Sequence, residues 1–173
     1  MDESPGPAPA SDRLLYTANR FARALNRAAE HTAMAHGITL PQLLALQVLG
    51  EGAGLSNAAL ARRIFVSAQA SHVVCQELCD AGLIARTPHP TNKRVRLVRL
   101  TADGWRVLQE CTVELRALED RLAATLPRTW DAPLPAILHT AAQSLAGGYF
   151  GDADAEAAAR ARAESGRPQG GHL

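Results

Sequence analysis

The apolar residues of the chain recur mostly with the spacing of helices. Between residues 12 and 35, leucine, alanine and phenylalanine return every three or four positions, with arginines between them. This spacing predicts a long amphipathic helix, and Gly37 stands where a glycine commonly ends a helix. A second, more apolar helix is predicted from its cap residue Thr39 to about Gly50.

Two short helices come next. Ser56 is placed to cap a helix that runs to about residue 64, and Ser67 to cap another that runs to about residue 81. A short bend separates the two, and Gly82 ends the second. Two short helices joined by a tight turn are typical of a helix-turn-helix.

A β-hairpin and two further helices complete the pattern. Apolar, β-branched runs over 84–87 and 94–100 flank a segment rich in proline and asparagine, which predicts a hairpin with a basic tip. Helices are predicted over 102–126 and about 130–146, ended by Pro127 and by a pair of glycines. The fold class is therefore mainly α with a small β-hairpin wing, a winged helix-turn-helix with flanking helices.

Composition narrows the class of protein. Hydrophobic residues make up 47% of the 173 residues and charged residues 20%, so the chain can bury a core. No uninterrupted apolar run is long enough to cross a membrane. The acidic, proline-rich first residues lack the basic and apolar regions of a secretory signal. Three cysteines, an odd number, fit a reducing cytoplasm. We expect a cytoplasmic protein with a disordered arm over 1–11, a single domain over 12–148 and a disordered tail over 149–173.

The charge is unevenly distributed along the chain. Its total of +1 hides a basic middle, because residues 56–100 carry seven basic against two acidic side chains, whereas the segments on either side are net acidic. A compact basic segment is what contact with nucleic acid requires, although a solvated basic face gives the same count. The sequence contains no glycine-rich phosphate loop, zinc motif, nucleophile elbow or carboxylate pair. It therefore predicts no enzyme, no metal site and no cofactor.

Several short motifs follow one another through the basic segment. Leu-Ser precedes the first short helix, which contains Leu-Ala-Arg-Arg, then Gly-Leu-Ile leads into the hairpin, and Leu100-Thr101-x-x-Gly104 starts the next helix. This ordered series resembles the winged helix of the MarR family of bacterial transcription regulators, and with the flanking helices the resemblance covers about residues 12–148. The hairpin tip departs from the family, since Asn92 replaces an acid and Lys93 the first of two arginines.

The resemblance implies a homodimer. Residues 12–36 and 102–148 would supply the dimerisation helices and residues 39–101 the DNA-binding winged helix. A two-fold dimer implies a pseudo-palindromic operator in double-stranded DNA. The function expected is that of a transcription regulator, a repressor released by a small aromatic or phenolic ligand.

The residues expected to contact DNA lie on the second short helix and on the hairpin. Glutamine can pair with adenine, histidine can donate to guanine, small apolar side chains can touch thymine methyl groups, and arginine suits the minor groove. Serine hydroxyls and the helix N-terminus suit phosphates. Arg94 is expected in the minor groove. The full set is Ser67, Ala68, Gln69, Ser71, His72, Val73, Gln76, Arg86, Lys93, Arg94 and Arg96.

The sequence also suggests residues that could bind a ligand, and it leaves two alternative functions open. An arginine beside an aromatic ring can hold a carboxylate, which makes the ligand candidates Arg13, Tyr16, Arg20, Met34 and His36. One alternative is a thiol-based regulator that uses Cys75 and Cys79, which stand four residues apart on one helix. The other is a winged helix that contacts only proteins, for which a basic wing would be unnecessary.

Overall fold

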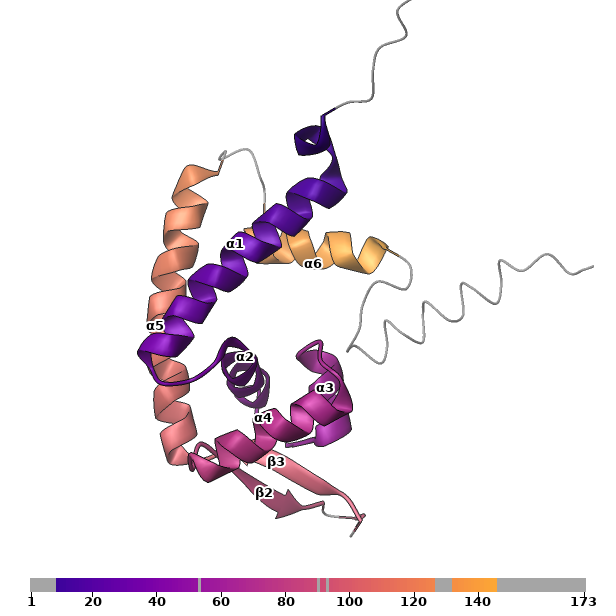
Figure 1. The fold of residues 1–173 in the computed structure, drawn as a ribbon, viewed down its shortest axis with the longest axis vertical. Helices are drawn as coiled ribbons and strands as arrows, with labels where there is room; N and C mark the ends of the chain where they lie inside the picture. Colours follow the sequence, from indigo (N-terminus) through magenta and orange to yellow (C-terminus); the bar gives the residue numbers. More distant parts are fainter. Residues whose placement is uncertain (1–8, 53, 90, 93, 127–131, 146–173) are drawn as a thin grey trace, which may run out of the picture.

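A computed structural model describes residues 9–52, 54–89, 91–92, 94–126 and 132–145. In Figure 1, α1 and α5 cross on one side of the molecule, and the hairpin lies beyond one end of α5. The elements are a 3₁₀ turn (Ala10–Asp12), α1 (Leu14–Ala35), α2 (Leu40–Leu49), β1 (Leu55–Ser56), α3 (Asn57–Arg63), α4 (Ala68–Asp80), β2 (Ile84–Pro88), β3 (Arg96–Leu100), α5 (Ala102–Thr125) and α6 (Leu134–Ser144). The predicted fold class is confirmed.

The predicted helix caps are present. Side chains of Thr39, Ser56, Ser67 and Thr101 each accept a hydrogen bond from a backbone N–H in the first turn of the helix that follows. These bonds satisfy donors that have no partner inside the helix, and each adds about 1 kcal/mol. The caps fix where four of the helices begin.

The sheet has three strands, one more than the hairpin predicted from the sequence. Its order is β1-β3-β2, and both pairings are antiparallel. Leu55 lies opposite Val98, and Ser56 opposite Leu97. A strand of two residues is too short to show the alternation of apolar and polar positions that predicts longer strands. This strand ties the segment before α3 to the base of the wing.

The two ends of the domain differ in detail from expectation. Ala10 and Ser11 belong to the 3₁₀ turn before α1, although residues 1–11 were expected to be a disordered arm. The last helix begins at Leu134, after Pro133, instead of near residue 130. The predicted tail over 149–173 lies outside the described residues. None of the described helices has both the length and the apolar character of a membrane span.

The core is built around α2, which lies inside the bundle (Figure 1). Leu43 and Leu46 are at most 1% exposed, and they pack in one cluster with Leu60 of α3, Leu78 of α4 and Cys111 of α5. A short helix surrounded by other elements has to be apolar nearly all round. This explains why α2 lacks the clear polar face of α1.

A tight joint connects the end of α4, the start of β2 and the start of α5. The hydroxyl of Thr101 donates to the carbonyl oxygens of Gly82 at 2.7 Å and Leu83 at 3.1 Å. The backbone N–H of Thr101 also donates to the carbonyl of Leu83, at 3.1 Å. Gly104 lies so close to this carbonyl that a Cβ added to it would stand 2.0 Å from the oxygen. Only glycine permits this approach.

We expect Gly104→Ala to destabilise the protein by at least about 3 kcal/mol, because the methyl group would collide with backbone atoms that cannot rotate away. Gly37→Ala is the matched control. Gly37 has φ +72° but open space around it, so the same substitution there costs only about 1–2 kcal/mol of backbone strain. Chemical denaturation of both variants measures the difference. Equal losses of unfolding free energy would contradict the role given to the joint.

Candidate nucleic-acid interface

Helix α4 presents a polar face to solvent and an apolar face to the core. Val74, Cys75 and Leu78 are buried. The residues expected to face DNA are instead exposed at the start and along one side of the helix, namely Ala68, Gln69, His72, Val73 and Gln76. The predicted division of the helix into two faces is confirmed. An exposed polar face on the second helix of a helix-turn-helix is what reading of a major groove needs.

Ser71 corrects one prediction. It was expected to contact a phosphate, but it is 0% exposed, and its hydroxyl donates to Oδ1 of Asn57 at 2.9 Å. The amide nitrogen of Asn57 donates in turn to the carbonyl of Ala68 at 2.9 Å. Asn57 therefore clamps the first turns of α4 to the start of α3. No pattern in the sequence points to Asn57.

The turn between α3 and α4 contains a strained residue. Phe65 has φ 59°, the left-handed conformation that usually requires glycine. The N–H of Val66 donates to the carbonyl of Ala61, and that of Phe65 to the carbonyl of Arg62, which together close the end of α3. The ring of Phe65 is 65% exposed. The left-handed turn sets the angle between the two helices.

Gln76 is already engaged by protein groups. Its amide nitrogen donates to Asp80 Oδ1 at 2.8 Å, and its amide oxygen accepts from Arg86 at 3.1 Å. Pairing with adenine needs the same donor and acceptor, so Gln76 would have to exchange these partners to read a base. Within the described part of the chain, the exposed side chains of Gln69 and His72 form no such pair of hydrogen bonds, and they remain the direct candidates for base contact.

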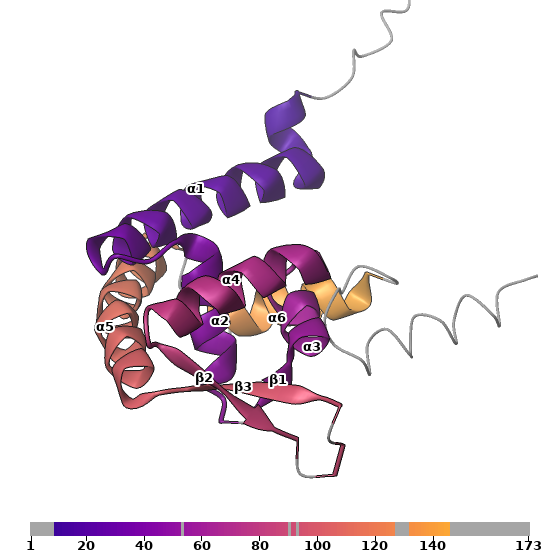
Figure 2. The same cartoon turned by 60° about the horizontal axis from the view of Figure 1, so that its bottom comes forward.

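The hairpin carries exposed arginines along both strands and at its tip. Arg86 lies on β2 and Arg96 on β3, and Arg94 lies at the tip, all exposed. Oδ1 of Asn92 accepts the backbone N–H of Arg94 at 3.1 Å. The structure thus retains an acceptor where the resemblance expects an acid. Lys93 lies outside the described residues. Figure 2 shows the hairpin reaching away from the body of the protein, next to α4.

Comparison with known proteins agrees with this architecture. The sequence profile of the MarR family matches residues 36–95. The HTH-type transcriptional repressor Rv2887 of Mycobacterium tuberculosis is 37% identical over 90 residues, which are 52% of this chain and 65% of that protein. A repressor of Mycobacterium bovis matches equally. The segment that forms the winged helix is therefore similar to the MarR family.

Solved structures extend the match beyond the winged helix. The crystal structure of the M. tuberculosis protein Rv2887 in complex with salicylic acid is 29% identical, with a TM-score of 0.62, over 79% of this chain and 98% of that one. CouR from Rhodococcus jostii, solved with p-coumaroyl-CoA, has a TM-score of 0.70 over 80% of this chain and 94% of its own, at 20% identity. At that identity the second match shows the fold alone. The curated relatives are matched over slightly less than two thirds of their length.

The five predicted ligand residues do not gather at one place. Tyr16 and Arg20 do meet on α1, where the guanidinium lies 6.0 Å from the ring centroid. Met34 and His36 lie four or five turns further along the chain, more than about 20 Å away along a helix. An arginine beside an aromatic ring is thus present, but the five residues do not form a single pocket.

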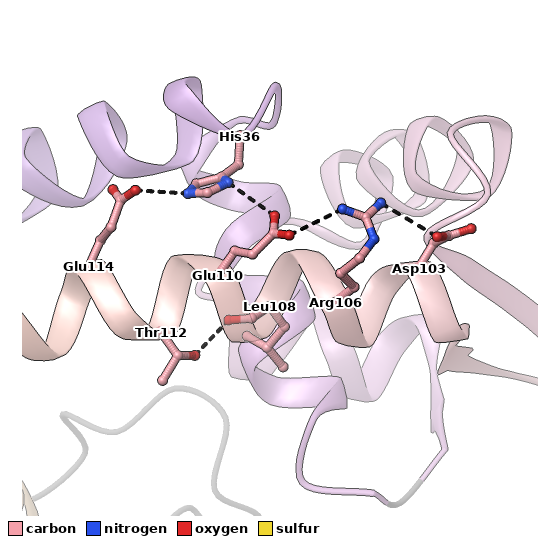
Figure 3. A network of polar contacts seen from close by, with 7 residues as sticks. All are labelled: His36, Asp103, Arg106, Leu108, Glu110, Thr112 and Glu114. Atoms are coloured by element: carbon pink, nitrogen blue, oxygen red, sulfur yellow. Dashed lines mark hydrogen bonds and ion pairs between the residues drawn. The ribbon is translucent and has the colours of Figure 1, made fainter.

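His36 faces carboxylates. Its two ring nitrogens lie 3.4 Å from Glu110 and 3.0 Å from Glu114 of α5. Glu110 also pairs with Arg106, which reaches Asp103 (Figure 3). Two acidic neighbours disfavour an anionic ligand beside the ring. The structure therefore gives His36 a different task, which is to hold the end of α1 against α5.

A cleft between α1 and α5 is a better candidate for a ligand site. It has a volume of about 400 Å³, within the range of small-molecule sites. His31 and Arg121 supply cationic or donor groups, and Leu118 supplies an apolar surface. The complete lining is Ala28, His31, Thr32, Glu114, Ala117, Leu118 and Arg121. None of the predicted ligand residues belongs to it, because sequence spacing does not show how α1 crosses α5.

The cysteines of this chain are mostly core residues. Cys75 and Cys111 are 2% and 0% exposed, and burial raises the pKa of both thiols. A raised pKa leaves less of the reactive thiolate. Cys79 is only partly buried, and all three are free. This environment favours packing over redox chemistry for Cys75. Among the described residues no cluster of histidine, cysteine and carboxylates could hold a metal ion.

Proposed function

We propose that the protein is a transcriptional repressor of the MarR family that binds double-stranded DNA. The observation that carries this proposal is the exposed polar face of α4 beside a hairpin whose described residues include four exposed arginines. The relatives that match the winged helix are named transcriptional repressors. A module that contacts only proteins would not need this concentration of basic side chains.

Each part of the interface has a task in this proposal. Gln69 and His72 read base edges in the major groove, where an amide or imidazole can pair with purine acceptors and donors. Val73, 51% exposed, touches thymine methyl groups. Arg94 enters the minor groove, whose negative potential attracts arginine. The hydroxyl of Ser67 and the N-terminus of α4 receive a phosphate.

A second copy of the chain completes the binding unit. Leu14 and Leu15 of α1 are 83% and 78% exposed, and no residue of α6 is buried. Contiguous exposed apolar residues mark an interface. The resemblance to dimeric regulators favours a second copy of the chain, related by a two-fold axis, as the partner that covers these residues. Such a dimer presents two recognition helices to successive major grooves on one side of the duplex.

The test is selection of duplexes from a random-sequence library by the purified protein, followed by titrations across a salt series. We expect an inverted repeat with half-sites about 10–10.5 base pairs apart, bound by two chains. Arg94→Ala should weaken binding by roughly tenfold or more. Arg116→Ala, which removes the same charge from an exposed site on α5, should leave it nearly unchanged. Failure to enrich any sequence would contradict the proposal and favour a protein partner.

We propose further that an aromatic carboxylate binds in the cleft between α1 and α5 and weakens DNA binding. Arg121 can hold the carboxylate, and Leu118 can pack against the ring. Glu114, the acidic residue of the lining, is already engaged by the imidazole of His36 at 3.0 Å. One related structure contains salicylic acid, an aromatic acid, and another contains p-coumaroyl-CoA, the thioester of an aromatic acid. A ligand between these helices changes how α1 packs on α5, and α5 begins at the joint with the winged helix.

Salicylate is the probe for this site. Isothermal titration should show binding that Arg121→Ala weakens by roughly tenfold, whereas Arg116→Ala, on the same helix but outside the cleft, should bind salicylate as the unchanged protein does. Saturating salicylate should also lower affinity for the selected duplex. Equal affinities of the two variants for salicylate would rule out the cleft as the site.

A further inference from the structure

The tip of the wing is organised by a histidine. The N–H of His89 donates to the carbonyl of Val95 at 3.1 Å, and the N–H of Val95 donates to the carbonyl of Asn92 at 3.0 Å. These two bonds lie beyond the paired residues of β2 and β3, the last of which are Pro88 and Arg96. These bonds therefore join His89, Asn92 and Val95 to one another beyond the last strand pair.

The imidazole of His89 accepts hydrogen bonds from the backbone of the same turn. Its Nδ1 atom lies 3.2 Å from the N–H of Thr91 and 3.1 Å from the N–H of Asn92. The hydroxyl of Thr91 is 3.3 Å from the same nitrogen. An aspartate or asparagine oxygen does the same in an Asx turn, where it accepts the N–H two residues further on. Here the ring nitrogen takes that place.

This arrangement requires one form of the ring. Nδ1 can accept only when it carries no proton, so the hydrogen must be on Nε2. A ring protonated at both nitrogens would point an N–H at two other N–H groups. The charged residues nearest to His89 in the sequence are Arg86, Lys93 and Arg94, all of them basic.

The turn continues to Arg94. The N–H of Asn92 donates to Nδ1 of His89. The Oδ1 atom of Asn92 in turn accepts the N–H of Arg94 at 3.1 Å. The backbone position of Arg94 thus depends on Asn92, and that of Asn92 on His89. Both capping groups are neutral, whereas an acid in either place would lower the positive charge that the wing offers to DNA.

We propose that His89 is the positioning residue of the wing, whose unprotonated Nδ1 holds the turn that presents Arg94 to the minor groove. The proposal rests on the proposed DNA-binding function, since it specifies which residue holds that arginine in place. His89 need not touch DNA, because its contribution is made through Asn92.

Two substitutions separate positioning from contact. His89→Ala removes the acceptor, and we expect it to weaken binding to the selected duplex roughly three- to tenfold, as for the loss of one or two hydrogen bonds. His89→Asn restores an acceptor of similar reach that has no titrating proton, so its affinity should stay within about twofold of the unchanged protein. If both variants lose affinity equally, the ring itself contacts DNA, and the positioning role is wrong. The role is equally wrong if His89→Ala binds normally.

Nuclear magnetic resonance of the free protein tests the turn independently of DNA. Nitrogen–proton correlation of the imidazole should show the proton on Nε2. The amides of Thr91 and Asn92 should exchange with solvent faster in His89→Ala than in His89→Asn. A proton on Nδ1, or equal exchange in the two variants, would overturn the inference. Absence of DNA binding by the unchanged protein would instead overturn the proposed function, while these spectra still decide whether His89 holds the turn.

Discussion

The carbonyl group of Leu83 is the point on which the architecture depends. Thr101 donates to it from both its backbone and its side chain, and Gly104 packs against it at a distance that excludes a methyl group. The group lies directly after the glycine that ends α4, where the chain enters the wing. Helix α4, the wing and α5, the longest of the described helices, therefore meet at one short segment of backbone. A rotation of α5 about this joint has to be shared by α4 and the hairpin, since cores are packed too closely to absorb it.

In the proposed mechanism, the ligand acts at the contact between α1 and α5. His36 holds the end of α1 to Glu110 and Glu114, and the cleft lined by His31 and Arg121 lies along the same pair of helices. In the proposed regulator, a ligand acts through its different affinity for two arrangements of these helices, which is the physical content of allosteric coupling. The two α4 helices of the dimer must lie at a fixed distance from each other to enter successive major grooves. A small change in the angle of α5 is therefore enough to move one α4 out of register with its half-site.

The sequence predicted well whatever is encoded locally. Thr39, Ser56, Ser67 and Thr101 cap helices as expected, and Gly37 and Gly82 end them with positive φ. These features depend on a residue and its near neighbours in the chain. The alternation of exposed and buried positions on α4 was likewise readable from helical periodicity.

Features that depend on contacts distant in sequence could not be predicted in this way. Its polar side chain alone predicts a phosphate contact for Ser71. Only the position of Asn57 explains why Ser71 is buried and hydrogen-bonded instead. The strand Leu55–Ser56 exists because β3 offers it an edge. The predicted ligand residues all lie on α1 or at its ends, whereas the cleft lies where α1 crosses α5. His89 gave no signal because an imidazole that caps a turn cannot be distinguished by spacing from one exposed to solvent.

Hydrogen–deuterium exchange of the full chain, with and without the selected duplex, tests the central claim most directly. Backbone amides that contact DNA or lie under it are shielded from opening and from solvent. We predict added protection in peptides covering residues 67–73 and 91–96, with little change over α6. Protection confined to α1 and α6, or none in the first turns of α4 under saturating duplex, would show that this face does not read DNA.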